Sequence, residues 1–248
     1  MTKTIRLMTL NLRVSAADDG PNNWPLRWPH IKALIQEIRP HVLGVQETMP
    51  NQMVAIMGEL SGYFAYMGPD TMITGGPSLR NPLFVCDCCQ RPYSEGVLAL
   101  NESGVIGQVS WDGKEPRLAH WLRFEGWTLV NTHFDSWDCE QARLESAKLL
   151  TEFLREEPAA IVMGDLNCTP DSPPIQHFRE AGYSLAKDTL PPGTDRYTFH
   201  KFTGQGLAEL DYILVRGVHI KRTQIPRPHR QPPYLSDHDP VVADIEIG

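Results

Sequence analysis

Short apolar runs that end or begin in polar side chains are the feature that most constrains this chain. Four runs carry their polar cluster at the C-terminal end: residues 7–11, 42–47, 129–135 and 161–167. Two later runs carry an acid first: residues 211–215 and 237–242. Short runs of β-branched and aliphatic residues are typical of buried strands. The sequence therefore predicts strands whose polar tips recur along nearly the whole chain.

The polar tips meet if the first four strands point one way and the last two are antiparallel to them. All of the clusters then lie along one rim of the sheets. The side chains expected there are Asn11, Glu47, His133, Asp165, Asn167, Asp211, Asp237 and His238. Carboxylates do not gather unless a cation holds them. The pattern therefore predicts a metal site of the kind that cleaves phosphate esters.

Helical patterns join these strands in pairs. Apolar spacing predicts helices over residues 25–39 and 139–155, each between two of the runs. A strand–helix–strand unit has parallel strands, which puts their tips on the same side. Further patterns predict a helix over 51–60 and strands over 97–100, 105–109, 118–124 and 241–247. We therefore predict an α/β fold in which two mixed sheets pack face to face with helices outside.

The length and composition are those of an ordinary globular protein. The chain has 248 residues, and no linker or repeat divides it, so we predict one domain over residues 1–248. No apolar stretch approaches the length of a membrane span, and no membrane insertion is expected. A strand pattern begins at Ile5, which leaves no room for a signal peptide and favours a cytoplasmic location.

The net charge of −7 bears on the substrate. Proteins that bind duplex DNA through its phosphates usually have a basic face or domain. Residues 216–230 contain basic residues and no acid, which indicates a solvated loop, with a phosphate-facing rim as the alternative. The acidic balance favours a small or single-stranded substrate over duplex DNA, and no protein partner is implied.

The five cysteines do not form a familiar pattern. They are Cys86, Cys88, Cys89, Cys139 and Cys168. An odd number and the lack of a secretory signal argue against a disulfide framework. The spacing of the first three differs from paired Cys-x2-Cys motifs, which disfavours zinc. We therefore expect ordinary reduced thiols, with redox regulation or zinc binding as alternatives.

Two motifs carry most of the predicted chemistry. Asp165 and Asn167 follow an apolar run, and their spacing turns both side chains to one face, where one can hold a water and the other its hydrogen bonds. His238 follows Asp237 and is a candidate charge partner for a phosphate oxygen, with Asp211 as the acid that would fix its tautomer. Oxygen ligands of this kind favour Mg²⁺, or Mn²⁺, over zinc.

The order of these motifs resembles the endonuclease/exonuclease/phosphatase superfamily, and its small bacterial members in particular. The resemblance runs from Ile5 to Ile247. It includes Gly20-Pro21-Asn22-Asn23-Trp24, Pro116-Arg117 and Thr198-Phe199-His200 besides the rim residues. The resemblance implies a four-layer α/β sandwich that hydrolyses phosphate esters with a divalent metal.

The resemblance also implies roles for individual residues. Metal binding is assigned to Glu47, with Asn11 and Asp237 close to the ion. The expected catalytic residues are His133, Asp165, Asn167, Asp211 and His238. Among them, Asp165 orients or deprotonates the attacking water, Asn167 helps to hold it, and Asp211 pairs with His238. The two histidines contact the phosphate, and Arg117, His133 and Asn167 are the expected substrate-binding residues.

One expected residue is not evident in the sequence. The acid that should brace His133, from the strand near Leu83, is replaced by Arg80 and Asn81. Glu95 is a candidate substitute. The partner of His133 therefore stays open at this point.

The sequence thus predicts a Mg²⁺-dependent phosphoesterase that acts by in-line attack of an activated water. Its substrate would be a small phosphate ester or a single-stranded nucleic acid. A nuclease acting on DNA or RNA is the alternative. Four aromatic residues lie near the motif loops, where a base could stack on them, although core packing or anchoring of a loop is the favoured interpretation of each: Trp137, Tyr197, Phe199 and Tyr234. A catalytically inactive binding module is a further alternative, which the intact set of rim residues disfavours.

Overall fold

The computed structural model describes residues 2–67, 81–101, 108–228 and 231–248. Within these ranges the chain forms two six-stranded sheets. The first sheet has the order β11-β12-β1-β2-β4-β3 and contains β1 (Lys3–Asn11), β2 (Val42–Gln46), β3 (Tyr63–Tyr66), β4 (Leu83–Cys86), β11 (His219–Gln224) and β12 (Val241–Ile247). The second has the order β5-β6-β7-β8-β10-β9 and contains β5 (Ser94–Ala99), β6 (Leu118–Phe124), β7 (Trp127–His133), β8 (Ala160–Asp165), β9 (Ser184–Leu185) and β10 (Asp211–Arg216).

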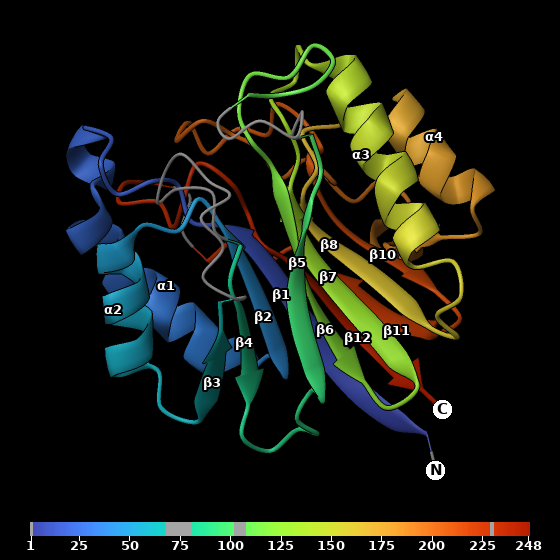
Figure 1. The fold of residues 1–248 in the computed structure, drawn as a ribbon. Coiled ribbons are helices and arrows are strands. Elements are labelled where there is room, and N and C mark those ends of the chain that lie inside the picture. The colour runs from blue at the N-terminus through green and yellow to red at the C-terminus, as the bar shows by residue number, and fades with distance from the viewer. Residues whose placement is uncertain (1, 68–80, 102–107, 229–230) are drawn as a thin grey trace.

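Helices cover the outer faces of both sheets, which makes four layers (Figure 1). The helices α1 (Trp24–Ile38) and α2 (Pro50–Glu59) pack on the first sheet. On the second sheet lie α3 (Glu140–Phe153) and α4 (Pro173–Glu180). A separate apolar core fills the space between the two sheets. The predicted sandwich of two mixed sheets with helices outside is confirmed.

Strand directions agree with the prediction that brings the polar tips together. β1 pairs with β2 in parallel, and β7 pairs with β8 in parallel. β12 is antiparallel to β1, and β10 is antiparallel to β8. Because the intervening helices return the chain to the same end of each sheet, the ends of β1, β2, β7 and β8 and the starts of β10 and β12 share one rim.

A polar contact joins the two sheets beneath this rim. Asn131 of β7 donates a hydrogen bond from Nδ2 to the Val45 carbonyl (3.0 Å), and Gln46 Nε2 donates to Asn131 Oδ1 (2.6 Å). Gly44 makes this approach feasible, because a Cβ there would lie 2.8 Å from Asn131 Cγ, whose amide is held by hydrogen bonds. Buried amides that are hydrogen-bonded in this way fix the alignment of the sheets.

Some expected elements differ from the structure. Residues 216–230 do not form only a loop: β11 pairs with β12 as an edge strand, and its polar sequence hid it because little of an edge strand is buried. Two basic side chains here pair with acids, Lys221 with Glu246 (3.0 Å) and Arg227 with Asp239 (2.8 Å), and Arg216 donates to backbone carbonyls such as that of Glu157 (3.2 Å). The predicted strand over 105–109 lies mostly outside the described residues. Among described residues, no helix is both long and apolar enough to cross a membrane.

The expectation of reduced thiols is wrong for one pair of cysteines. Cys86 and Cys88 form a disulfide, with their Cα atoms 5.3 Å apart. The turn that follows β4 brings these two side chains together, a geometry that their sequence spacing did not reveal. Cys139 and Cys168 are buried free thiols, as expected.

Candidate active site

The rim carries a pocket of about 1030 Å³. Its lining includes six of the residues predicted for the site and one predicted substrate contact: Glu47, His133, Asp165, Asn167, Asp237, His238 and Arg117. The other two, Asn11 and Asp211, are fully buried behind this surface, where they hydrogen-bond residues of the lining. The structure therefore brings together all the side chains that the sequence placed at the rim.

Asn11, at the end of β1, ties together two acids of the pocket. Its Nδ2 donates to Glu47 Oε1 and to Asp165 Oδ2, both at 3.0 Å. The second oxygen of Glu47 accepts a bond from the Val14 backbone N–H (3.1 Å). Glu47 has φ of 57°, a left-handed conformation rare outside glycine and found at functional sites. This turn after β2 aims the carboxylate into the pocket.

Asp165 ends β8 at the centre of the site and is only 1% exposed. Its Oδ1 accepts a hydrogen bond from the Asn167 backbone N–H (2.9 Å). Gly164, with φ of 142°, lets β8 end this close to β7, because a Cβ would collide with the Thr132 carbonyl. With Asn11 holding Oδ2, both carboxylate oxygens are fixed in orientation.

His238 lies between two carboxylates. Its Nδ1 is 2.8 Å from Asp211 Oδ2, and its Nε2 is 3.7 Å from Asp165 Oδ2. Burial alone would lower the pKa of His238, but the charges of Asp211 and Asp165 and the hydrogen bond to Asp211 raise it well above its usual range. The raised pKa favours the imidazolium at neutral pH, and Nε2 faces Asp165 Oδ2 in the pocket.

His133, at the end of β7, has the opposite electrostatic character. Burial, with the nearby charges of Arg117 and His238, lowers its pKa well below the usual value, so the ring is neutral. Nε2 lies 3.1 Å from Asn167 Nδ2. Glu95, considered as its bracing acid, instead lies beside His120 at 3.4 Å, because β5 presents it two strands away from β7. Of the two residues at the position where the acid was expected, Arg80 lies outside the described residues, and Asn81 donates its Nδ2 to the Leu118 carbonyl (2.9 Å).

Burial raises the pKa of Asp165 to about 7; the charge of His238 opposes this rise, and that of Asp211 adds to it. A carboxylate that titrates near neutrality is suited to accept a proton from water. The site therefore contains a raised carboxyl pKa at Asp165, a raised histidine pKa at His238 and a lowered one at His133. Groups whose pKa values are shifted in different directions by their surroundings are typical of acid–base catalysis.

Two residues near the pocket, Arg13 and Arg143, were not singled out from the sequence, whereas Asp135 belongs to the polar cluster over residues 129–135. Arg13 lies between Asp19 (3.2 Å) and Asp237 (4.0 Å). Arg143 of α3 is 4% exposed and lines the pocket, and its position on the same helical stripe as the buried apolar residues was the available signal. Asp135 is buried beneath Arg117, with Oδ1 4.0 Å from its Nε.

Two groups of side chains could hold a cation. Asp165, Asp211 and His238 place ligand atoms within 4.8 Å of one another, but the imidazolium already offsets the two carboxylates. Glu47 and Asp237, with the Asn11 amide, offer oxygen ligands at the open pocket, and this donor set fits Mg²⁺ or Mn²⁺. In the structure the Asn11 amide nitrogen faces the acids, so its role as a ligand stays a prediction.

A four-layer sandwich with an acidic, histidine-containing pocket at one rim defines a class of hydrolases that act on phosphate ester bonds. The chain belongs to the Endonuclease/Exonuclease/phosphatase family, whose model matches residues 8–238. It is accordingly an enzyme of this class. No curated protein matches the chain by sequence.

Solved structures share this fold over nearly the whole chain. The endonuclease/exonuclease/phosphatase from Bacteroides vulgatus is 28% identical, with a TM-score of 0.87 over 99% of this chain and 100% of that chain. The mannosyl-6-phosphatase of Bacteroides thetaiotaomicron is 22% identical, with a TM-score of 0.83 over 97% and 99%. The human Nocturnin catalytic domain, with bound sulfate, is 20% identical, with a TM-score of 0.76 over 98% and 94%.

Replacing Asp211 by asparagine should change the titration of His238. Loss of the carboxylate removes a charge that raises the His238 pKa, so the imidazolium should lose its proton at lower pH. Because the pKa of His238 is raised in the folded state, its pairing with Asp211 stabilises the fold fully at pH values below the ordinary histidine pKa of about 6.5. This stabilisation is lost as the pH rises through the folded-state pKa of His238. In the variant, the alkaline limb of the kcat/KM profile should move to lower pH.

Histidine NMR titration and pH–rate profiles measure this shift. Asp188→Asn, a partly exposed acid of the 3-10 helix η3 (Ala186–Thr189), is the matched control and should leave both curves unchanged. Lower activity in Asp211→Asn with an unmoved His238 titration would contradict the pairing.

Proposed function

We propose that the protein is a Mg²⁺-dependent phosphoesterase that hydrolyses a phosphodiester or phosphomonoester by in-line attack of an activated water. The observation that carries this proposal is the environment of Asp165. Its oxygens are fixed by Asn11 and Asn167, and His133 and His238 flank it at 3.4 and 3.7 Å. A base of this kind between two phosphate-binding groups fits water attack on phosphorus.

The chain's own residues can divide the reaction as follows. Asp165 accepts a proton from water as its oxygen attacks phosphorus. The Nε2–H of charged His238 donates a hydrogen bond to a phosphoryl oxygen and stabilises the negative charge on that oxygen. The ester P–O bond then breaks, and the leaving oxygen takes up a proton. Neutral His133 and the Asn167 amide help to position the phosphoryl group.

Glu47 and Asp237, with Asn11, are the residues that would hold the cation. When bound there, Mg²⁺ would neutralise negative charge that develops on the phosphoryl and leaving oxygens. Arg117 lines the same pocket, where its Nη2 lies 2.8 Å from the exposed carboxylate of Glu115. An anionic group of the substrate would compete with Glu115 for this guanidinium.

Removal of divalent cations is expected to abolish hydrolysis of a bis-aryl phosphate, and added Mg²⁺ should restore it. The reason is that the negative charges of Glu47 and Asp237 disfavour phosphate binding unless a bound cation offsets them. Stopped assays with chelator, followed by Mg²⁺ or Mn²⁺ addition, measure this. Circular dichroism before and after chelation checks that the fold persists. Activity that survives thorough chelation would reject the metal.

A nuclease is the second candidate, and one observation favours it. Trp137 lines the pocket and is 76% exposed, so its ring is available to stack on a base. The net charge of −7 favours a single strand or a small ester over duplex DNA. Relative kcat/KM values on phosphomonoesters, bis-aryl phosphates, phosphosugars, and single- and double-stranded oligonucleotides would separate the candidates.

A further inference from the structure

Three cysteines gather at the end of the first sheet opposite the active site. β4 ends at Cys86, and the following turn carries Cys88 and Cys89. His41 lies beside them, directly before β2 begins. Because the opposite end of β2 leads to Glu47, the length of this strand separates the cluster from the pocket, about 17 Å at the usual rise per residue. The cluster is therefore not part of the hydrolytic site.

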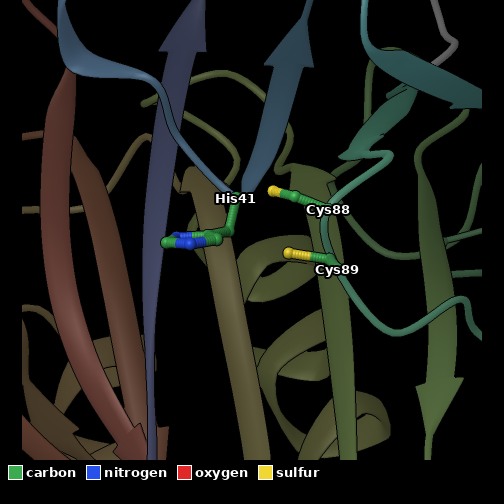
Figure 2. Close-up of side chains that lie close together, drawn as sticks. All are labelled: His41, Cys88 and Cys89. Carbon is green, nitrogen blue, oxygen red and sulfur yellow. The ribbon is translucent and has the colours of Figure 1, made fainter.

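The ligand atoms of this cluster lie close enough to share one ion. Cys86 and Cys89 Sγ are 3.0 Å apart, and Cys86 also bonds Cys88. Ligand atoms of His41, Cys88 and Cys89 all lie within 4.8 Å of one another. Figure 2 shows the Cys88 and Cys89 sulfurs turned toward the segment that carries His41. Tetrahedral Zn²⁺ with bonds of about 2.3 Å places two sulfurs about 3.8 Å apart, within this range.

We propose that, in the reduced protein, Cys86, Cys88 and Cys89 bind one thiophilic divalent cation of the Zn²⁺ type. Thiolates select such ions, whereas the oxygen ligands of the active-site pocket select hard ions. The cation would join the end of β4 to the turn after it, at the edge of a surface depression of about 720 Å³ that Cys86, Cys88 and His41 help to line.

The charges near this site are mixed. Arg39 and Asp87 line the same depression, Arg6 there is paired with Asp244 (2.7 Å), and Lys3 lies with Cys89 along a neighbouring depression. Three thiolates around a divalent cation leave a net negative charge, which Arg39 and Lys3 would offset.

His41 lies beside the sulfurs but is less suited than they are to bind the ion. Its Nδ1 accepts a hydrogen bond from the Arg6 backbone N–H (2.8 Å). A neutral ring that accepts at Nδ1 carries its proton on Nε2, so ligation requires this hydrogen bond to break. We therefore assign the ligands to the sulfurs, and expect loss of His41 to weaken binding less than loss of a sulfur.

The Cys86–Cys88 disulfide and the cation exclude each other. A dithiol reductant supplies two electrons and two protons to this bond and itself becomes a disulfide. Binding of the cation then releases the three thiol protons. The oxidised chain should bind no thiophilic cation here, and the bound cation should protect the cysteines from oxidation.

The test is a Co²⁺ titration of the full-length protein, reduced and then freed of reductant, in excess Mg²⁺. Thiolate–Co²⁺ charge-transfer absorption should appear with one cation per chain, and Zn²⁺ should displace it. Oxidised protein should show none. Cys88→Ser and Cys89→Ser should lose most of the band, and His41→Ala should keep the band with affinity about tenfold weaker.

Cys139→Ser is the matched control, because Cys139 is a buried thiol outside the cluster, and it should titrate like the wild type. Absence of the charge-transfer band in reduced wild type would overturn the proposal. So would a band that survives in a Cys88→Ser/Cys89→Ser double variant. Because the absorption arises only from thiolates, these outcomes are independent of whether the active-site pocket hydrolyses a phosphate ester.

Discussion

Asp165→Asn is expected to lower turnover by about 10³-fold, within the range of 10² to 10⁴ attributed to a general base. The amide cannot accept the proton of the attacking water. The substitution keeps the size of the side chain, so Asn11 and the Asn167 backbone retain a neighbour in place. Steady-state kinetics on a bis-aryl phosphate with saturating Mg²⁺ measure the effect, which should fall mainly on kcat.

The control for this variant is Asp171→Asn. Asp171 is exposed and lies six positions further along the same loop, outside the pocket lining. The control should keep wild-type kinetics, and both variants should unfold at temperatures near that of the wild type. A near wild-type kcat for Asp165→Asn would show that another group activates the water.

Arg27→Met is expected to destabilise the fold by about 3 to 5 kcal/mol, the range seen when one partner of a buried charged network is removed. Arg27 is fully buried, and its guanidinium donates to four backbone carbonyls: Asn22 (2.6 Å), Leu12 (2.8 Å), Leu235 (2.9 Å) and Arg13 (3.2 Å). Methionine fills a similar volume but donates no hydrogen bond. Burial lowers the Arg27 pKa to about 10, which still leaves it charged at neutral pH.

Thermal and urea unfolding measure this loss, and a fall in the unfolding temperature on the order of 10 °C is expected for a chain of this size. Lys32→Met is the matched control on the same helix. Lys32 forms a partly exposed ion pair with Glu59 (2.9 Å), which should contribute at most about 1 kcal/mol. A change within 1 kcal/mol for Arg27→Met would contradict the role of this network.

Arg27 also bears on the active site. Arg27 donates to the carbonyl of Leu12, which directly follows Asn11. It also donates to the carbonyl of Leu235, which lies two positions before Asp237. Its loss should therefore loosen the segments that carry two of the proposed cation-binding residues. A raised requirement for Mg²⁺ in any folded Arg27→Met protein is the expected kinetic sign.

Local sequence patterns predicted most of the central elements. The strand predicted over residues 241–247 is β12, and the helices predicted over 25–39 and 139–155 are α1 and α3, within one or two residues at each end. The helical connections also gave the parallel pairs β1–β2 and β7–β8. Edge strands were the main omission: β3 and β11 bury few side chains, so little apolar periodicity marks them.

The residue types and order at the strand ends were thus enough to predict the sandwich and the set of rim residues, whereas Arg13 and Arg143 in the pocket lining were missed. The roles of Glu47, Asp165 and His238 stay predictions, and the chelation experiment, Asp165→Asn and Asp211→Asn respectively test them.

Only the tertiary structure decided the contacts between segments distant in sequence. Asn11 meets Asp165 because two sheets pack face to face, and their alignment depends on buried amides such as Asn131. Within the second sheet, the pairing of β5 with β6 puts Glu95 beside His120 and not His133. Within the first sheet, the pairing of β2 with β4 brings His41 to the cysteines after β4. The physical reason is that strand and helix patterns arise from neighbours a few residues apart, whereas these contacts arise from the pairing of distant strands and the packing of the two sheets.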